Sequence, residues 1–68
     1  MKAKVIANGQ PREVELPCTV AQFLAQCGWK PTQVVVECNG NILPRSELAT
    51  RSLQDNDRLE IIIPVAGG

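Results

Sequence analysis

The 68-residue sequence contains no histidine, only one Trp and one Phe, and no pair of cysteines in CxxC spacing. Without histidine the chain cannot form the Ser–His or Cys–His pair that activates a nucleophile. Its seven acidic residues mostly alternate with apolar residues, which is typical of a solvated strand face and not of a paired acid and base in a cleft. A chain this short also has little volume in which to enclose a ligand. We therefore expect no catalytic residues.

The three cysteines, Cys18, Cys27 and Cys38, are widely spaced. An odd count argues against a disulfide framework, and without histidine the chain offers too few ligands for structural zinc. Free cysteine is among the most often buried residue types. We expect no metal site and three cysteines that act as small hydrophobic residues, with Cys18 the most exposed.

The sequence also has no excess of either charge and no long apolar run. Seven Lys and Arg balance seven Asp and Glu, without the basic cluster of a nucleic-acid binder or of a membrane-surface anchor. No apolar stretch approaches the roughly 20 residues that span a bilayer, and the first residues lack a signal-peptide pattern. We expect a cytoplasmic protein that binds neither nucleic acid nor membrane.

The apolar pattern that is present predicts one α+β domain, a mixed sheet of four to five strands covered by one helix. Asn8-Gly9 and Asn39-Gly40 each favour the type I′ turn of a two-residue hairpin. Alternation of apolar and polar residues marks the strands. The expected strands are residues 2–7, 12–16, 34–38, 41–43 and 58–63, and the last places Leu59, Ile61 and Ile63 on one face.

The helix is expected near residues 20–27. Thr19 and Gln22 match a capping box, and the apolar residues that follow recur at helical spacing on one stripe. Gly28 suits the left-handed position after a helix end. Ser46 is expected to cap a second, one-turn helix through Thr50, and Leu53 to fill the core beneath it.

Three outward-facing aliphatic residues stand out among charged neighbours. In the expected topology the first and third strands flank the last, which would bring Ile6, Val35 and Ile62 together on the face opposite the helix. Scattered surface hydrophobic residues are common in soluble proteins. A contiguous apolar group with a polar rim instead resembles an interface core, and we expect these three residues to form a partner-binding surface.

After Pro64 the sequence ends in Val65-Ala66-Gly67-Gly68. Glycine has no Cβ, so such a segment can enter a channel too narrow for other residues. The alternative is a frayed end or a remnant of expression. We expect a domain over residues 1–64 and a flexible di-glycine tail over residues 65–68.

The motifs together resemble the ThiS family, the ubiquitin-like sulfur carriers of thiamin biosynthesis. The matching segments occur in the family's order across nearly the whole chain: Asn8-Gly9, Cys38-Asn39-Gly40, residues 44–48, residues 53–59 and Ala66-Gly67-Gly68. Asn56 stands where the family often has glycine, and asparagine also tolerates left-handed backbone angles.

This resemblance implies a β-grasp fold and a carrier that partner enzymes act upon. An E1-like adenylating enzyme (ThiF-like) would thread Ala66 and Gly67 into its site and adenylate the Gly68 carboxylate, using its own ATP and Mg²⁺. A sulfur donor such as a cysteine desulfurase would then convert Gly68 to a thiocarboxylate. Thiazole synthase (ThiG-like) would receive that sulfur. The chain itself is expected to bind no cofactor.

Three other functions share parts of this pattern. The small subunit of molybdopterin synthase has the same kind of fold and di-glycine end, although the middle of this sequence resembles that family less. A ubiquitin-like modifier would join its terminal glycine to a target lysine. A simple interaction module would leave the terminal residues chemically unused.

Overall fold

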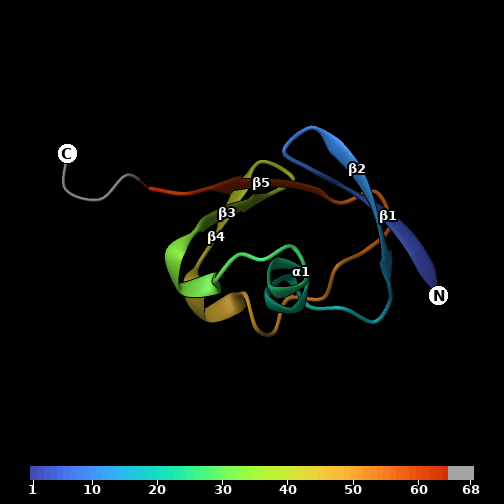
Figure 1. Cartoon of the computed structure of the whole chain (residues 1–68), viewed down its shortest axis with the longest axis horizontal. Helices are drawn as coiled ribbons and strands as arrows, with labels where there is room; N and C mark the ends of the chain where they lie inside the picture. Colours follow the sequence, from blue (N-terminus) through green and yellow to red (C-terminus); the bar gives the residue numbers. More distant parts are fainter. Residues whose placement is uncertain (65–68) are drawn as a thin grey trace.

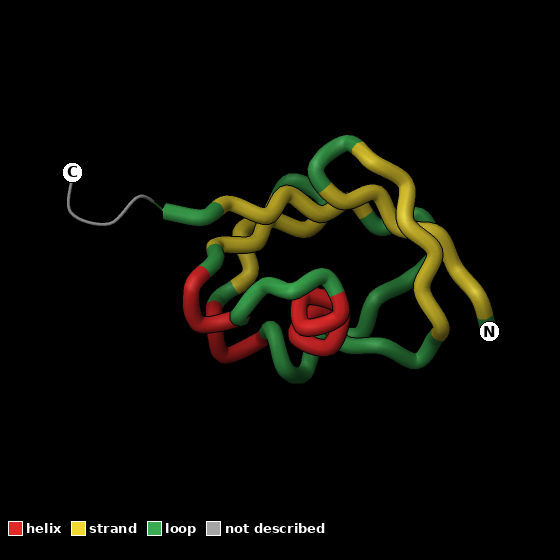
Figure 2. Tube along the Cα trace, viewed as in Figure 1, coloured by secondary structure: helices red, strands yellow, loops and turns green. Residues whose placement is uncertain are grey.

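The structure is a computed structural model that describes residues 1–64. Five strands form one mixed sheet in the order β2-β1-β5-β3-β4. One α-helix and two short 3₁₀ helices lie on a single side of this sheet (Figures 1 and 2). The predicted tail, Val65, Ala66, Gly67 and Gly68, lies outside the described residues. The elements are β1 (Lys2–Ala7), β2 (Gln10–Glu15), α1 (Val20–Gln26), η1 (Pro31–Gln33), β3 (Val35–Cys38), β4 (Asn41–Leu43), η2 (Arg45–Glu47) and β5 (Arg58–Ile62).

The sheet topology confirms the α+β plan. β5 pairs in parallel with β1 and antiparallel with β3, so the last strand occupies the centre of the sheet. The two outer pairs, β1–β2 and β3–β4, are antiparallel hairpins. A parallel neighbour requires a crossover, which the segment containing α1 supplies. This arrangement is the ubiquitin-like β-grasp fold.

Both hairpins turn on the predicted Asn-Gly pairs. Asn8 and Gly9 have φ of 52° and 80°, and Asn39 and Gly40 have φ of 52° and 87°. A type I′ turn requires positive φ at both central positions, which asparagine and glycine tolerate best. The two turns therefore fix the registers of the outer strand pairs.

Helix α1 carries the predicted capping box. The Thr19 N–H donates to Gln22 Oε1 (2.9 Å), and the Gln22 N–H donates to Thr19 Oγ1 (3.1 Å). Val20, Phe23 and Leu24 of this helix are buried against the sheet. Gly28 has φ of 88° just beyond the helix, as predicted. Within residues 1–64, sixteen buried apolar residues, including the predicted Leu53, form one core between the helix and the sheet.

Three local predictions are wrong. Cys18 is 3% exposed and Cys27 is the half-buried cysteine, because the Leu53 N–H donates to the Cys18 carbonyl (2.8 Å) and holds that segment inside. Ile63 is 60% exposed because β5 ends at Ile62. The predicted helix at Ser46 is the shorter η2, which follows Pro44 and has no side-chain cap.

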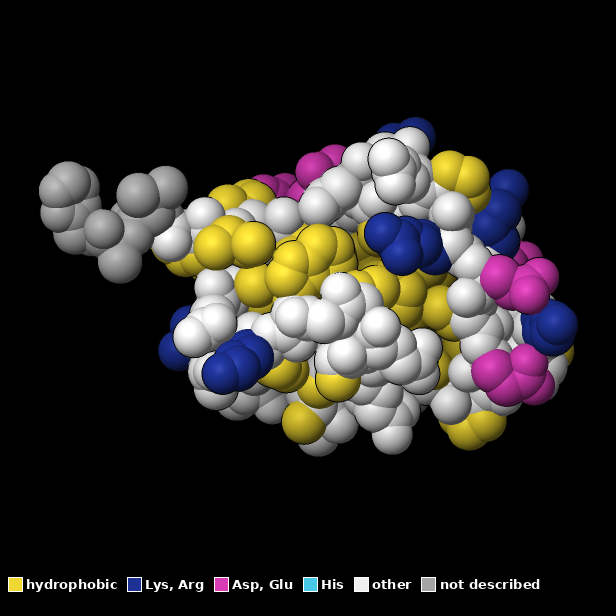
Figure 3. All heavy atoms as spheres, viewed as in Figure 1, with side chains coloured by type: hydrophobic (Ala, Val, Ile, Leu, Met, Phe, Trp, Pro, Cys, Tyr) yellow, Lys and Arg dark blue, Asp and Glu magenta, His cyan; other side chains and the backbone are white. Residues whose placement is uncertain are grey.

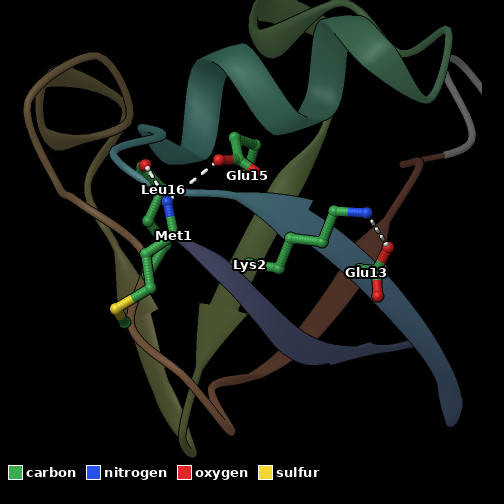
Figure 4. A network of polar contacts seen from close by, with 5 residues as sticks. All are labelled: Met1, Lys2, Glu13, Glu15 and Leu16. Atoms are coloured by element: carbon green, nitrogen blue, oxygen red, sulfur yellow. Dashed lines mark hydrogen bonds and ion pairs between the residues drawn. The ribbon is translucent and has the colours of Figure 1, made fainter.

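Ionic contacts at the corner where the chain begins join β1 to the end of β2 (Figure 4). The Met1 ammonium donates to Glu15 Oε1 (2.9 Å) and to the Leu16 carbonyl (3.2 Å). Lys2 Nζ lies 3.4 Å from Glu13 Oε1. These groups are exposed, so their ion pairs contribute little to stability.

Candidate functional site

The candidate site is the sheet surface around the end of β5, where the chain leads on to the terminal glycines. β5 crosses the middle of the sheet, and the described chain leaves it on the side away from the N-terminus (Figure 1). The last paired residue is Ile62, opposite Val35. Pro64 follows, and proline has no backbone N–H to continue a ladder. The terminal segment therefore begins at a defined point of a central strand.

The face of the sheet opposite α1 carries no helix among residues 1–64 (Figure 2). Its outward positions mix aliphatic and charged side chains, as the alternation predicts. These positions are Lys2, Lys4, Ile6, Pro11, Glu13, Glu15, Val35, Glu37, Ile42, Arg58, Glu60 and Ile62.

The structure brings two of the three predicted surface residues together. Val35 and Ile62 are direct cross-strand partners, and Ile62 is 46% exposed. Ile6 instead lies opposite Arg58. Arg58 precedes Ile62 by four residues, so the two positions are about 13 Å apart along β5. The parallel pairing covers only Ile6–Arg58 and Ala7–Leu59, so β1 stops well before β5 does. The predicted grouping of Ile6 with the other two is therefore wrong.

Ile42 takes the place predicted for Ile6. It is 67% exposed and lies opposite Glu37, on the same face as Val35. Val35 and Ile42 both line a shallow cleft of about 280 Å³. We call Val35, Ile42 and Ile62 the β5-end patch. A two-residue turn at Asn39-Gly40 places Asn41 opposite Cys38, so the hairpin register could have identified Ile42 from the sequence.

Two like charges border the β5-end patch. Glu37 and Glu60 are direct cross-strand partners, and neither forms an ion pair with a Lys or Arg within residues 1–64. Like charges directly opposite each other on a sheet are destabilising. Acidic side chains are visible along the outer edge of the sheet in Figure 3, close to hydrophobic side chains where the described chain ends. Arg45 lines the same cleft as Val35 and Ile42, so the patch has a charged rim of both signs.

The cysteines lie away from this surface, and the thiols of two of them have low reactivity. Burial raises the pKa of the Cys18 thiol, and the neighbouring Cys27 adds to this. Burial also raises the pKa of Cys38, where Asp57 reinforces the effect and Arg51 opposes it. A thiol with a raised pKa is a poor nucleophile at neutral pH. The described residues contain no cluster of His, Cys, Asp and Glu that could hold a metal ion, and no helix in residues 1–64 could cross a membrane.

A mixed five-stranded sheet with one helix across it places the described residues in the class of ubiquitin-like β-grasp domains. A model of the ThiS family matches residues 5–68, which includes both glycines. The chain therefore belongs to the ThiS family.

Solved structures and curated sequences agree with this family. The crystal structure of the thiamine biosynthesis protein ThiS from Geobacter metallireducens superposes with a TM-score of 0.80 at 26% identity, covering 96% of this chain and 99% of that one. A thiazole synthase of Paramagnetospirillum magneticum is 35% identical over 65 residues, or 96% of this chain. The uncharacterized protein ycf40 of Pyropia yezoensis is 33% identical over 61 residues, 86% of its length.

The thiazole synthase relatives are much longer proteins. The chain spans 20% of the length of the Paramagnetospirillum protein, and also 20% of a thiazole synthase from Magnetococcus marinus that is 31% identical. A segment similar to this chain therefore occurs in longer proteins that are named as an enzyme, thiazole synthase.

Proposed function

We propose that the chain carries sulfur as a thiocarboxylate on Gly68. The observation that carries this proposal is the ThiS family match that extends through Gly67 and Gly68. The absence of histidine and the raised pKa of the buried thiols leave the chain few groups of its own for catalysis. The terminal carboxylate, ionised at neutral pH, is then the reacting group, and partner enzymes supply the catalysis.

Two substitutions convert this carboxylate. One Gly68 oxygen attacks the α-phosphorus of ATP in an E1-like adenylating enzyme, the bond to the β-phosphate breaks, and Mg²⁺-bound pyrophosphate leaves. The acyl-adenylate is electrophilic, so a persulfide sulfur attacks its carbonyl carbon and AMP leaves. A thiol then reduces the remaining S–S bond and releases the thiocarboxylate. The persulfide comes from a donor such as a cysteine desulfurase.

Ala66 and Gly67 make this reaction accessible. Small side chains let an extended segment enter a narrow channel, and glycine adopts backbone angles that other residues avoid. The ATP, the Mg²⁺ and the groups that activate them belong to the adenylating enzyme in this proposal.

The acceptor in this proposal is a thiazole synthase. Support comes from the two long relatives of that name, each of which contains a segment similar to this chain. Two domains that are joined in one polypeptide in some species often act together as separate proteins in others. We therefore propose that this chain acts together with a thiazole synthase. All these reactions are proposed for the cytoplasm.

The β5-end patch is the proposed docking surface for the adenylating enzyme. Val35 and Ile62 sit at the point where the chain leaves the sheet, and Ile42 extends the apolar area. An apolar centre with a charged rim is the usual composition of a protein interface. Ile6 lies outside this patch and is not needed for it.

Intact-mass measurement tests the proposal. The purified chain is incubated with ATP, Mg²⁺, the adenylating enzyme and a persulfide donor. We expect the mass gain that accompanies replacement of one oxygen by sulfur, located on the C-terminal peptide. Deletion of Gly68 should abolish the gain while thermal stability is kept. An unchanged mass would overturn the proposal, and sulfur passed to molybdopterin synthase instead of thiazole synthase would reassign the pathway.

A further inference from the structure

Asn8 does more than form a turn. β1 and its pairing with β5 end at Ala7, yet hydrogen bonds to β5 continue at Asn8. The Asn8 backbone N–H donates to the Leu59 carbonyl (2.9 Å), and Asn8 Oδ1 accepts from the Ile61 N–H (2.7 Å). The Asn8 side-chain oxygen thus takes the place of the backbone carbonyl that a longer β1 would offer. It accepts from the Ile61 N–H, which lies beyond the last paired residue of β1.

Asn39 binds β5 from the side of β3, opposite to Asn8. It has the same φ of 52° and the same position in its turn as Asn8. Its backbone N–H donates to the Arg58 carbonyl (2.8 Å), and its Oδ1 accepts from the Arg58 N–H (2.9 Å). Asn39 Nδ2 also donates to the buried Asp57 carboxylate (3.0 Å). Asn39 therefore holds the beginning of β5, whereas Asn8 holds its end.

We propose that Asn8 is a positioning residue for the reaction at Gly68; this inference rests on the proposed function. The last fixed points before the terminal segment are the Val35–Ile62 pair on one side of β5 and the Asn8–Ile61 bond on the other. Beyond them, Ile63 is largely exposed and Pro64 cannot donate. Asn8 thereby fixes the end of β5, and a fixed end of β5 is what would present the following residues to the adenylating enzyme.

Loss of this bond should weaken productive docking more than the chemistry. The end of β5 would then be held from the β3 side alone, and the freed backbone would have to be ordered again on binding. Ordering the backbone of one residue lowers affinity roughly five- to thirtyfold. This loss of affinity should raise KM and leave kcat nearly unchanged, because once the variant is docked and threaded it presents the same carboxylate to ATP.

Three substitutions separate positioning from folding. Asn8→Gly removes the acceptor but keeps the positive φ that the turn needs. Asn8→Asp keeps an oxygen that can accept from Ile61 and is the conservative rescue. Asn39→Gly is the control for loss of stability, since it removes the turn side chain at the other end of β5, including both its bond to the Arg58 N–H and its bond to Asp57.

Two measurements follow, at a temperature where circular dichroism shows every variant folded. Amide hydrogen exchange of the isolated chain should be faster at Ile61 in Asn8→Gly and near wild type in Asn8→Asp. Pyrophosphate release by the adenylating enzyme with ATP and Mg²⁺ should show KM for Asn8→Gly raised roughly five- to thirtyfold, with kcat nearly unchanged. Asn8→Asp and Asn39→Gly should keep a near-wild-type KM.

The outcomes are distinguishable. Unchanged Ile61 exchange or an unchanged KM in Asn8→Gly, with a wild-type chain that is adenylated normally, overturns this inference alone. An equal rise of KM in Asn39→Gly also overturns it, because a general loss of stability then explains the effect. A wild-type chain that is not adenylated overturns the proposed function together with this role.

Discussion

Two single residues show how burial makes a thiol unreactive in this fold. Cys18 and Cys38 are both buried, at 3% and 2% exposure. Removing a thiol from water penalises its charged form, which is why burial raises the pKa of each. Protonated and buried thiols are protected from thiol–disulfide exchange, which begins with a thiolate.

The raised thiol pKa values predict a loss of stability at alkaline pH. The unfolded chain releases these protons near the ordinary thiol pKa, while the folded chain retains them. The stabilisation is therefore complete below the unfolded-state pKa and is lost as pH rises through the folded-state pKa. Denaturant unfolding between pH 7 and 10 should show the free energy of unfolding falling more steeply in wild type than in the Cys18→Ala/Cys38→Ala double variant.

Cys27→Ala is the matched control for that experiment, since it removes the half-buried thiol. It should keep most of the steeper alkaline loss seen in wild type, because burial, the larger cause of the raised pKa, remains at Cys18 and Cys38 and only the smaller contribution of Cys27 to Cys18 is removed. Parallel pH profiles for wild type and the double variant would show that the two buried thiols do not contribute.

At the level of single residues, the sequence predicted backbone conformation better than side-chain partners. Asn8, Asn39 and Asn56 all have positive φ, which their type and their neighbours indicate. The bond from Ile61 to Asn8 joins residues 53 positions apart. No local pattern encodes such a contact, because it exists only once β5 lies beside β1.

Among the elements, helix α1 depends on its cap. It has only seven residues, well below the roughly 12–15 at which isolated helices become marginally stable in water. The helix must therefore be stabilised by two contributions: the packing of its buried face, and hydrogen bonds to the N–H groups of its first turn. The reciprocal bonds between Thr19 and Gln22 provide the second of these contributions.

Thr19→Ala should destabilise the fold by about 0.5–2 kcal/mol, the usual cost of losing an N-cap side chain. The Gln22 N–H then loses its protein acceptor at the helix start. Thr32→Ala is the control, because Thr32 is an exposed threonine of η1 without a cap bond. Denaturant midpoints of the two variants provide the measurement, and equal midpoints would show that the cap adds nothing.

The elements that the sequence predicted correctly carry strong local signals. Both hairpin turns and the capped helix are examples, as are the alternating inward residues of β1 and β3. Errors occur where a tertiary contact decides the outcome. The segment of Cys18 is held in the core by the hydrogen bond from the Leu53 N–H to the Cys18 carbonyl. Ile63 lies beyond Ile62, the last residue of β5 that pairs with β3.

The whole molecule has two unequal sheet faces and a directional central strand. One face is covered by α1, and its core residues are almost entirely buried. The other face is open, and its β5-end patch lies where β5 leads to the terminal glycines. The placement of this patch follows from strand order and register together, so the sequence alone grouped Ile6 with it wrongly.

The open face predicts different effects for two isoleucines that the sequence grouped together. Ile62 is partly exposed within the β5-end patch, so Ile62→Asp should leave the melting temperature nearly unchanged. Burying one aliphatic side chain contributes on the order of 1.5–3 kcal/mol, so binding to the adenylating enzyme should weaken roughly ten- to a hundredfold. The added carboxylate would also join the acidic pair Glu37–Glu60 on the same face.

Ile6→Asp is the matched comparison, because Ile6 is the same residue type on the same face but lies opposite Arg58. Its register places it about 13 Å along β5 from Ile62, so a few-fold change in affinity at most is expected. Isothermal titration of wild type and both variants with the adenylating enzyme measures the difference. Equal affinity for Ile62→Asp and wild type would exclude the β5-end patch as the docking surface. Equal weakening by both substitutions would instead mean that the partner covers the whole open face, from the β1–β2 hairpin to the end of β5.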